Sequence, residues 1–579
     1  MDHMPQLGHY TAWQLIKLYW RSEKRKYAYA AALFIILMTL VLVAFDVIFS
    51  YWFNYFYDAL QEYKLHQAIY LLVMFFALAG LYIILAVYRY YISQVFGLRW
   101  RRWLTEQFID RWLLNRDYYF LETFDEHTDN PDQRIQEDIN SLVVNSISLS
   151  IGLIGAVTTF LAFIYVLWQL SGKLHLHLGS LGTWNIPGYL VWVAIIYSSI
   201  GTYLTFKIGR PLVGLNFEQQ RREATFRFAA IDLRSHAENV ALYRGEGHQK
   251  SILQQLFGRV LDNWYAIILR QKLLLWFTSG YNQAAVALPL LVVLPNYFEK
   301  VFLLGGLMQS LRAFSSIQDA LSFFVNSYPQ IAEWRAVTQR LTTLLDHMNA
   351  IDQKVAEQDQ LSFHKEAENK IVAKNVSIST PNGSALLKGI NEEFIHKQNY
   401  LLQGISGIGK STFIRTIAGI WPYAAGDIVL PTRQKIMYLP QKVYMPIGTL
   451  AEAILFPDKQ HPELETMLPQ VLRDCRLENL IPRLNETAAW SDQLSPGEQQ
   501  RVAFARVLIH KPDWVFLDET TSMLDLANEA HMYNLLKTQL PNCSIISVSH
   551  RPTLDTFHDH VINVTRYSAG AAAQLVPSG

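Results

Sequence analysis

The stretch Gly404-Ile405-Ser406-Gly407-Ile408-Gly409-Lys410-Ser411-Thr412 decides how the second half of this chain folds. It matches the phosphate-binding loop pattern, in which a glycine and four further residues precede Gly-Lys-Ser. The glycines let the backbone curl so that successive N–H groups point toward phosphate oxygens. The pattern predicts that Lys410 contacts the β- and γ-phosphates of a nucleotide and that Ser411 offers a hydroxyl to Mg²⁺. The helix that begins here also directs its positive end at the phosphates.

The residues on either side supply the strand–loop–helix context that this pattern requires. The apolar run 400–403 is predicted as a buried strand entering the loop, and 411–420 as the helix leaving it. Before them, 371–400 alternates short apolar runs around the turn Pro381-Asn382-Gly383, which indicates a small β-subdomain. We therefore expect an α/β nucleotide-binding domain over 350–567.

Four further residues are predicted to complete the nucleotide site. The apolar stretch 514–517 ends in two carboxylates, of which we expect Asp518 to hold Mg²⁺ and Glu519 to act as the base toward water. Gln441 follows the run Tyr438-Leu439-Pro440 and is placed to sense Mg²⁺. His550 follows the predicted strand 544–548 and is placed to reach a γ-phosphate.

A helix start with an unusual composition lies between these pieces, over Leu494-Ser495-Pro496-Gly497-Glu498-Gln499-Gln500-Arg501. Ser495 and Glu498 have the spacing of a capping box, and Pro496 suits the first helical position. The structural interpretation is a well-capped helix. The functional interpretation is a second anion site at the helix start.

The composition indicates that much of the chain lies in lipid. Its 579 residues call for two or more domains, and its net charge of +1 gives no reason to expect a nucleic-acid partner. Hydrophobic residues make up 51% and charged residues 17%, whereas a soluble protein averages about 25% charged. The two cysteines, Cys475 and Cys543, are too few for a disulfide framework.

Six long apolar segments are each able to cross a bilayer of about 30 Å. They cover 28–53, 67–93, 143–170, 187–209, 273–294 and 301–327. They form a predicted transmembrane domain over 27–349, preceded by an amphipathic helix within 1–26 on the cytoplasmic membrane surface. The final residues 568–579, rich in Ala, Gly and Ser, are expected to be an appended tail outside the fold.

Basic residues set the predicted orientation. They gather before the first segment and in the two long connections after the second and fourth, at Lys17, Arg21, Lys24, Arg25, Lys26, Arg99, Arg101, Arg102, Arg111, Arg116, Arg210, Arg221, Arg222, Arg227 and Arg234. Both termini and the nucleotide-binding domain are therefore expected in the cytoplasm. The two long connections should extend the membrane helices and end in short transverse helices.

Two places in this membrane half carry functional expectations. The turn and helix-start residues Asn130, Pro131, Asp132, Gln133 and Arg134 are expected to contact the nucleotide-binding domain; the alternative is a solvated loop. Arg312 and Asp46 fall inside apolar segments, where charges usually face a bundle interior or a watery cavity. They are candidates for a polar translocation path, and snorkelling toward the helix ends is the alternative.

This set of motifs, in this order, resembles the nucleotide-binding domain of ABC transporters. In that family Leu494, Ser495, Pro496, Gly497, Glu498 and Gln499 correspond to the signature motif, and Ser522 to Asp525 to the D-loop. The resemblance implies that the signature of one subunit closes over the phosphate loop of another. It therefore implies a homodimeric half-transporter with an exporter-like type IV fold, ATP and Mg²⁺ as cofactors, and a lipid bilayer around it.

The membrane half resembles bacterial transporters of the SbmA/BacA-like group with a fused ATPase, and the subfamily D half-transporters of peroxisomes and lysosomes. The residues that carry this likeness are Asn130–Asp138, Glu218–Glu223, Ala241–Glu246, Leu321–Phe324 and Ile331–Ala336. There are departures: Pro496 and Glu498 replace the usual Gly and Gln of the signature, and Met523 the usual Ala of the D-loop. The aromatic residue that usually stacks on adenine is missing near Thr380, so base selectivity is expected to be loose.

The resemblance implies an ATP-driven transporter of a bacterial inner membrane that imports a bulky hydrophilic solute, such as a cobalamin-like vitamin or a peptide. Export of a peptide, lipid or drug is the main alternative. An ATP-gated channel and a sensor or assembly protein that uses ATP as a switch are minor alternatives. The complete set Ser495, Glu519 and His550 argues against a channel, because gating alone does not require hydrolytic residues.

Overall fold

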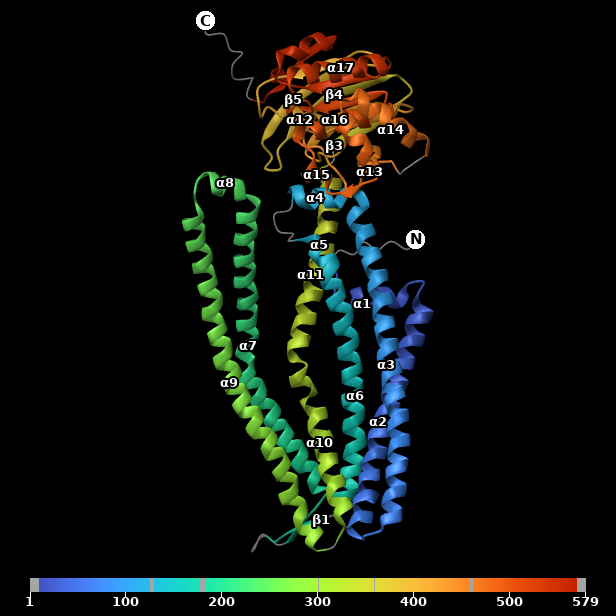
Figure 1. Cartoon of the computed structure of the whole chain (residues 1–579), viewed down its shortest axis with the longest axis vertical. Coiled ribbons are helices and arrows are strands. Elements are labelled where there is room, and N and C mark those ends of the chain that lie inside the picture. The colour runs from blue at the N-terminus through green and yellow to red at the C-terminus, as the bar shows by residue number, and fades with distance from the viewer. Residues whose placement is uncertain are drawn as a thin grey trace. The chain divides into compact units, whose positions relative to one another are not determined.

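The computed structural model describes residues 10–124, 130–171, 173–177, 183–299, 301–358, 360–458 and 462–569. The chain divides into two compact units, Met1–Asn349 and Ala350–Gly579, here called the N-terminal unit and the C-terminal unit. Figure 1 shows that the first is mostly helical and that the second mixes strands with helices. The boundary falls inside one helix, α11 (Tyr328–Gln358).

The N-terminal unit consists of long helices, drawn in blue to yellow-green in Figure 1. Its elements are α1 (Ala12–Arg21), α2 (Arg25–Gln61), α3 (Leu65–Leu113), η1 (Leu114–Arg116), α4 (Asp117–Phe124), α5 (Pro131–Gln133), η2 (Arg134–Asp138), α6 (Ile139–Ser171), β1 (Lys173–His177), β2 (Thr183–Pro187), α7 (Tyr189–Ser235), α8 (Ala237–Leu242), α9 (Glu246–Phe298), α10 (Leu304–Asn326) and α11. The predicted surface helix corresponds to α1, and residues 1–9 lie outside the described residues. The expected tail starts too early, because Ser568 bridges Leu387 of the C-terminal unit and Ala569 N donates to Leu386 O. Residues 570–579 lie outside the described residues.

Five described helices are long and apolar enough to cross a membrane: Arg25–Gln61, Leu65–Phe124, Pro131–Ser171, Tyr189–Ser235 and Glu246–Leu294. The sixth predicted segment, 301–327, forms α10 but is not among them, because polar residues such as Gln309, Arg312 and Asp319 lower its hydropathy. The helices are also longer than the apolar segments that the sequence predicts. The 53 residues of α9 span about 80 Å at the usual rise, far more than a bilayer core of about 30 Å.

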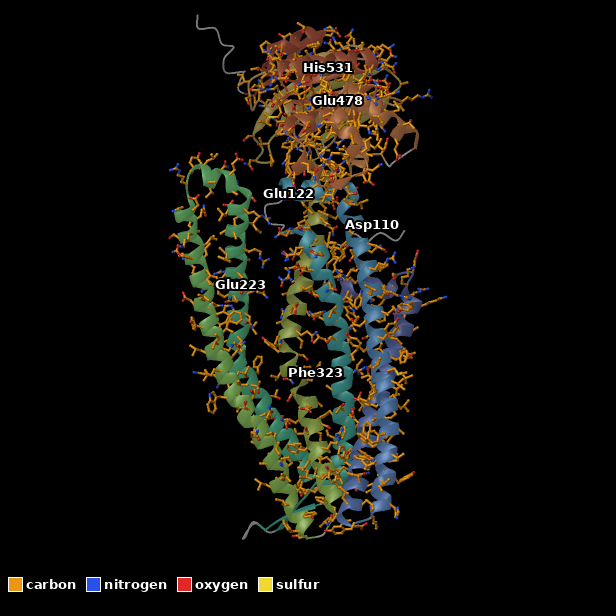
Figure 2. The ribbon with its side chains drawn as sticks, in the orientation of Figure 1. Asp110, Glu122, Glu223, Phe323, Glu478 and His531 are labelled. Atoms are coloured by element: carbon orange, nitrogen blue, oxygen red, sulfur yellow. The ribbon has the colours of Figure 1, made fainter. Side chains whose placement is uncertain are left out.

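Helix α10 packs inside this bundle despite its polarity. Phe314 and Ile317 of α10 are buried with Phe163 of α6 and Leu190 of α7 in one apolar cluster. Phe323, labelled in Figure 2, lies over Gly152 of α6, where an added Cβ would be 2.5 Å from its ring. The first amides of α10 are capped by α2, because Asp58 Oδ1 accepts a hydrogen bond from Gly305 N at 2.7 Å and Gln61 Oε1 one from Leu304 N at 2.6 Å.

This close contact between α2 and α10 is testable at Gly305. A Cβ at Gly305 would lie 1.9 Å from Asn54 O, a backbone atom that cannot move aside alone. We expect Gly305→Ala to force the helices apart and to destabilise the fold by about 1–3 kcal/mol, as overpacking does. The measurement is thermal unfolding in detergent. Gly280→Ala in α9 is the matched control, since nothing lies within 4 Å of its added Cβ. Equal melting temperatures for both variants would contradict the contact.

The C-terminal unit contains two principal sheets. A four-stranded sheet has the order β3-β7-β4-β5 and a five-stranded parallel sheet the order β13-β6-β12-β11-β8; β9 and β10 form a small antiparallel pair. The strands are β3 (Gln360–Glu366), β4 (Lys370–Ser379), β5 (Ala385–Ile395), β6 (Tyr400–Gln403), β7 (Ala424–Pro431), β8 (Ile436–Leu439), β9 (Gly448–Thr449), β10 (Thr487–Ala488), β11 (Trp514–Asp518), β12 (Ser544–Val548) and β13 (His560–Asn563). The predicted β-subdomain and the predicted strands at 400–403, 514–518 and 544–548 are thus confirmed.

Both faces of the parallel sheet are buried, and the other described elements of the C-terminal unit are helices. They are α12 (Lys410–Ile417), α13 (Leu450–Leu455), α14 (Pro462–Asp474), η4 (Glu478–Arg483), α15 (Trp490–Gln493), α16 (Pro496–His510), α17 (Leu526–Gln539), η5 (Pro552–Phe557) and η6 (Val564–Tyr567). In β11, Trp514 and Phe516 join the core shared with the four-stranded sheet, whereas Val515 and Leu517 join the core under α16 and α17. Such two-sided burial explains the continuous apolar run before Asp518.

The parallel order places the predicted site at one edge. Strands β6, β12, β11 and β8 are neighbours, so their carboxyl ends meet there. Ligands in open α/β sheets bind at the carboxyl ends of the strands. The residues that follow these four ends include Gly404, His550, Glu519 and Gln441.

Candidate functional site

The phosphate-binding loop connects β6 to α12 in a backbone conformation that favours glycine. Gly407 has φ +77° and Gly409 φ +108°, both in the left-handed region that a side chain would disfavour. Helix α12 begins at Lys410 and ends at Ile417, three residues before the predicted end at Ile420. The first N–H groups of a helix are without intrahelical partners, so this loop can bind an anion.

The Lys410 ammonium lies at the centre of the loop. Its Nζ donates to Gly404 O at 3.0 Å and to Ile405 O at 3.1 Å, and lies 3.0 Å from His550 Nε2. The residue is buried, and burial holds the pKa of Lys410 below its usual value, although Glu519 and Asp518 oppose that shift. The structure therefore brings together Lys410 and His550, which are far apart in the sequence.

Ser411 and Asp518 face each other across α12 and β11. Ser411 Oγ donates to Asp518 Oδ1 at 2.7 Å. Burial raises the pKa of Asp518, and the bond from Ser411 acts in the opposite direction. A hydroxyl and a carboxylate oxygen are the hard oxygen donors that Mg²⁺ prefers, and nucleotide-bound Mg²⁺ usually has few protein ligands. The residues present therefore fit this cation.

The raised pKa gives Asp518 a cost that substitution can reveal. Above that pKa the folded protein carries a buried charge, so the ionised carboxylate destabilises the nucleotide-free state. We expect Asp518→Asn to raise the melting temperature of the nucleotide-free protein at neutral pH. The gain should disappear as the pH falls below the raised pKa, because wild-type Asp518 is then neutral too. The same variant should lose Mg²⁺-dependent hydrolysis by about a hundredfold or more.

The checks are calorimetry at several pH values and an ATPase assay. Asp513→Asn, in the half-buried residue before β11, is the control that should change neither property, because an amide can still accept the hydrogen bond from Lys435 N. A nucleotide-free Asp518→Asn protein that melts below the wild type at neutral pH would contradict the burial cost.

Glu519, Gln441 and His550 lie together beside Lys410. Gln441 Nε2 donates to Glu519 Oε2 at 2.9 Å, and Glu519 Oε1 lies 3.6 Å from His550 Nε2. Glu519 has φ +48°, which is uncommon for a residue with a side chain. The tight turn after β11 directs its carboxylate toward the other two residues. A carboxylate held beside an amide and an imidazole can orient and deprotonate water.

The signature segment has the predicted capping box. Ser495 is the N-cap of α16 and Pro496 its first residue. Glu498 Oε2 accepts from Ser495 N at 2.9 Å and from Ser495 Oγ at 2.8 Å, and Glu498 N donates to Ser495 Oγ at 3.3 Å. Gln499 Nε2 donates to Leu494 O at 2.9 Å, and Leu494 is buried. The first turn of α16, which includes Gly497, is therefore held by several hydrogen bonds.

The D-loop segment, residues 522–525, leads into α17. Asp525 is the N-cap, since its Oδ1 accepts from Asn528 N at 2.7 Å and its Oδ2 from Asn528 Nδ2 at 2.9 Å. These bonds, led by the one from Asn528 N, lower the pKa of Asp525. Ser522 Oγ accepts from Gln500 of α16 at 3.2 Å. Asp525 therefore has a structural role in addition to any role at a subunit interface.

The predicted inner connections form short helices in the N-terminal unit. Asn130 is left-handed with φ +44°, Pro131 and Asp132 begin α5, and the chain continues through η2 into α6. Gln133 bonds Glu137, and Arg134 pairs with Asp138. Arg340 of α11 also binds Asp138, with Nε 2.8 Å from Oδ2. The second connection forms α8, which joins the ends of α7 and α9 in Figure 1.

Arg312 and Asp46 come together between α10 and α2. The Arg312 guanidinium lies 4.8 Å from the centre of the Phe53 ring. The carboxylate of Asp46 interacts electrostatically with both Arg312 and Arg89. Beside them, Asn54 Nδ2 donates to Gln309 Oε1 at 2.6 Å. The helix pair thus carries a polar seam within the bundle.

The sequence patterns did not predict the contacts of several residues in the C-terminal unit. The chain has no aromatic residue next to Thr380, but the fold brings Trp421 there, where its Nε1 donates to Ser379 O at 3.0 Å. Arg551, next to His550, and Gln500, in the signature helix, both bind the D-loop. Only their positions beside the motifs could have indicated these contacts. Gln500 is 23 residues from its partner Met523, and Arg551 is 29 residues from its partner Ser522.

Comparisons with known proteins match each unit to a family of ABC transporter domains. The family described as ABC transporter transmembrane region 2 matches residues 15–298, and the family described as ABC transporter matches residues 387–522. An ABC transporter ATP-binding protein of Haemophilus influenzae is 38% identical and covers 91% of this chain and 87% of its own length. The inner membrane ABC transporter ATP-binding protein YddA of Escherichia coli is 33% identical and covers 95% of this chain and 96% of its own length.

More distant proteins agree. ATP-binding cassette sub-family D member 3 of Homo sapiens is 25% identical and covers 80% of this chain and 73% of its own length. A solved bacterial Atm1-family ABC exporter with ATP bound covers 96% of this chain and 100% of its own, with a TM-score of 0.67 at 18% identity, so it shows the same fold. The chain therefore belongs to the ABC transporters. It is a multi-pass membrane protein with a fused ATP-binding domain and is related to the subfamily D half-transporters. Its ATPase activity is coupled to transport.

Proposed function

We propose that this protein is a homodimeric importer of a bulky hydrophilic solute, either a cobalamin-like vitamin or a peptide, in a bacterial inner membrane. The observation that carries the ATP-driven part is the convergence of Lys410, Glu519 and His550 on one edge of the parallel sheet. Import and cargo rest on the resemblance to the SbmA/BacA-like and subfamily D transporters. The name of the Escherichia coli relative supports the inner membrane.

In this proposal each site residue has a defined role. The loop Gly404–Thr412 binds the phosphates, with Lys410 at the β- and γ-phosphates. Ser411, Asp518 and Gln441 would hold Mg²⁺, which would supply positive charge for the phosphoryl group. Glu519 takes the proton of the attacking water, and His550 holds the γ-phosphate. The 2.7 Å bond between Ser411 and Asp518 and the 2.9 Å bond between Gln441 and Glu519 support these assignments.

The second subunit is proposed to complete each site. Within one chain, the Ser495 side chain contacts Glu498 and not the phosphate loop. Leu494 to Gln499 would therefore close over the phosphates bound by the partner, as two-fold symmetry allows. Pro496 has no N–H to offer, which leaves Gly497 and the Ser495 hydroxyl as the main donors. Ser522 and Asp525 of the D-loop would lie at the same interface.

The membrane half is proposed to convert closure of the two ATPase domains into alternating access. Residues 130–134 act as the coupling loop, and both termini and the ATPase domain are cytoplasmic. The contacts of Arg134 and Arg340 with Asp138 support a coupling element that moves as one piece with α6 and α11. The seam with Arg312 and Asp46 provides the polar surface along which a hydrophilic solute passes.

Uptake into proteoliposomes tests this function and its direction. Labelled cobalamin and a labelled cationic peptide are added outside vesicles that contain Mg²⁺-ATP. Molecules whose ATPase domain faces the lumen should then accumulate label in the lumen, because an importer moves solute toward its ATPase side. Accumulation only with ATP outside would show export. Glu519→Gln vesicles are the matched control, and equal label in both preparations would contradict ATP-driven transport of these solutes.

A further inference from the structure

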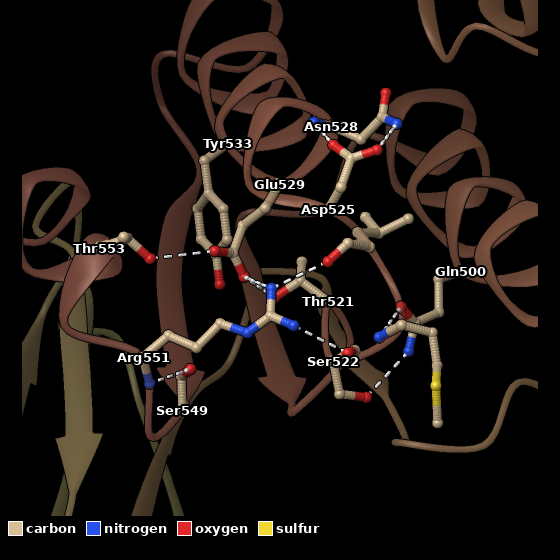
Figure 3. Close-up of polar contacts among 12 residues, drawn as sticks. Gln500, Thr521, Ser522, Asp525, Asn528, Glu529, Tyr533, Ser549, Arg551 and Thr553 are labelled. Atoms are coloured by element: carbon tan, nitrogen blue, oxygen red, sulfur yellow. Dashed lines mark hydrogen bonds and ion pairs between the residues drawn. The ribbon is translucent and has the colours of Figure 1, made fainter.

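The residue that follows His550 binds the D-loop backbone. Arg551 Nη2 donates to Ser522 O at 2.9 Å, and its Nη1 donates to Leu524 O at 3.0 Å (Figure 3). One planar guanidinium thus spans two carbonyls of residues 522–525. A lysine could not reproduce this, because its ammonium is a single point charge without the fixed fork of donors.

Arg551 also faces a buried carboxylate. Its Nη1 lies 3.3 Å from Glu529 Oε1, and the Glu529 side chain is only 2% exposed. Glu529 further accepts from Thr521 Oγ1 at 2.6 Å and from Thr553 Oγ1 at 3.1 Å, as Figure 3 shows. A buried charge is costly without a partner. Arg551 therefore has two separable effects: it compensates Glu529, and it holds the D-loop carbonyls.

Gln500 binds the same segment from the signature helix. Its Oε1 accepts from Met523 N at 3.0 Å and its Nε2 donates to Ser522 Oγ at 3.2 Å. Gln500 is itself buried. The D-loop is therefore held between α16, which begins at the signature, and the segment that carries His550.

We propose that Arg551 is a positioning residue for ATP hydrolysis, which acts by fixing Ser522 and Leu524 of the D-loop relative to His550. This proposal rests on the proposed ATPase site. The two ends of the Arg551 guanidinium fix the positions of the D-loop carbonyls. His550, the residue before Arg551, has its Nε2 3.0 Å from Lys410 Nζ. A shift of the D-loop would thus disturb the alignment of the reacting groups without removing any group that binds ATP.

Two single variants and their combination separate positioning from charge compensation. Arg551→Met removes the fork and leaves Glu529 uncompensated, so it should lower both the melting temperature and kcat. Glu529→Gln keeps the shape and an acceptor oxygen, and should leave kcat within about twofold of the wild type, since nearby groups and the fork remain in place. In the double variant no uncompensated charge remains, so the melting temperature should recover.

The decisive quantity is kcat of the double variant, measured with the full-length protein in nanodiscs. Positioning predicts that kcat stays reduced by about tenfold to a hundredfold, as misplacements of about 1 Å do, while the KM for ATP stays unchanged. Arg551→Lys should be stable and similarly slow. Recovery of wild-type kcat in the double variant would overturn the proposal and leave Arg551 as a charge partner only. An inactive wild-type protein would instead contradict the ATPase site itself.

Discussion

Glu519→Gln is expected to retain ATP binding and to lose hydrolysis by about a hundredfold to ten-thousandfold, the usual contribution of a general base. The amide has nearly the same shape as the carboxylate, so the turn after β11 should persist. The amide oxygen can still accept the hydrogen bond that Gln441 Nε2 donates to Glu519 Oε2 at 2.9 Å in the wild type. It cannot take a proton from water. The variant should therefore remain in the ATP-bound state.

The measurements are ATP binding by equilibrium dialysis and phosphate release at saturating Mg²⁺-ATP. Glu486→Gln is the matched control, because Glu486 pairs with Arg483 on the exposed surface of the same unit. It should hydrolyse ATP like the wild type. Turnover of Glu519→Gln within threefold of the control would show that another group takes the proton, and would leave Glu519 as a partner of Gln441.

The arrangement of the proposed nucleotide site was predictable because each of its pieces is encoded locally. Gly404 to Ser411 form a continuous pattern, and the apolar run before Asp518 requires a strand buried on both faces. The capping box of Ser495 and Glu498 involves neighbouring residues only, and the structure confirms it. Once the strands are parallel neighbours, their carboxyl ends must meet. The proximity of Lys410 and His550 follows from this topology and not from either segment alone.

The contacts that the sequence did not reveal join residues from separate segments. The indole of Trp421 lies beside Ser379 because β4 and β7 pair antiparallel, with Ile378 opposite Ala424. Gln500 resembles any polar residue on a helix until Met523 is placed against it. In helix α10, polar residues lower the hydropathy that the sequence reports. Hydrogen bonds that join Gln309 and Gly305 to residues of α2 nevertheless allow this helix to pack within the bundle.

Mixing two inactive proteins is expected to restore ATP hydrolysis, because the proposed sites combine Lys410 of one subunit with Gly497 of the other. Lys410→Met removes the cation from the phosphate loop but leaves the signature intact. Gly497→Asp leaves the phosphate loop intact and puts a negative charge in the first turn of α16, where it would repel the phosphates held by the partner. That charge favours the helix itself, and an added Cβ would meet Met523 O only at 3.4 Å.

Each variant alone should lose hydrolysis by about a hundredfold or more, as the loss of a charged phosphate contact does. A mixed dimer has one site with both defects and one with none. Random assembly of equal amounts makes half of the dimers mixed, so up to about a quarter of wild-type activity should return when the sites act independently. Gly497→Asn has the same shape without the charge and is the control for folding and steric effects. Sites formed within single subunits would remain defective in every dimer, so a mixture as inactive as its components would contradict the shared site.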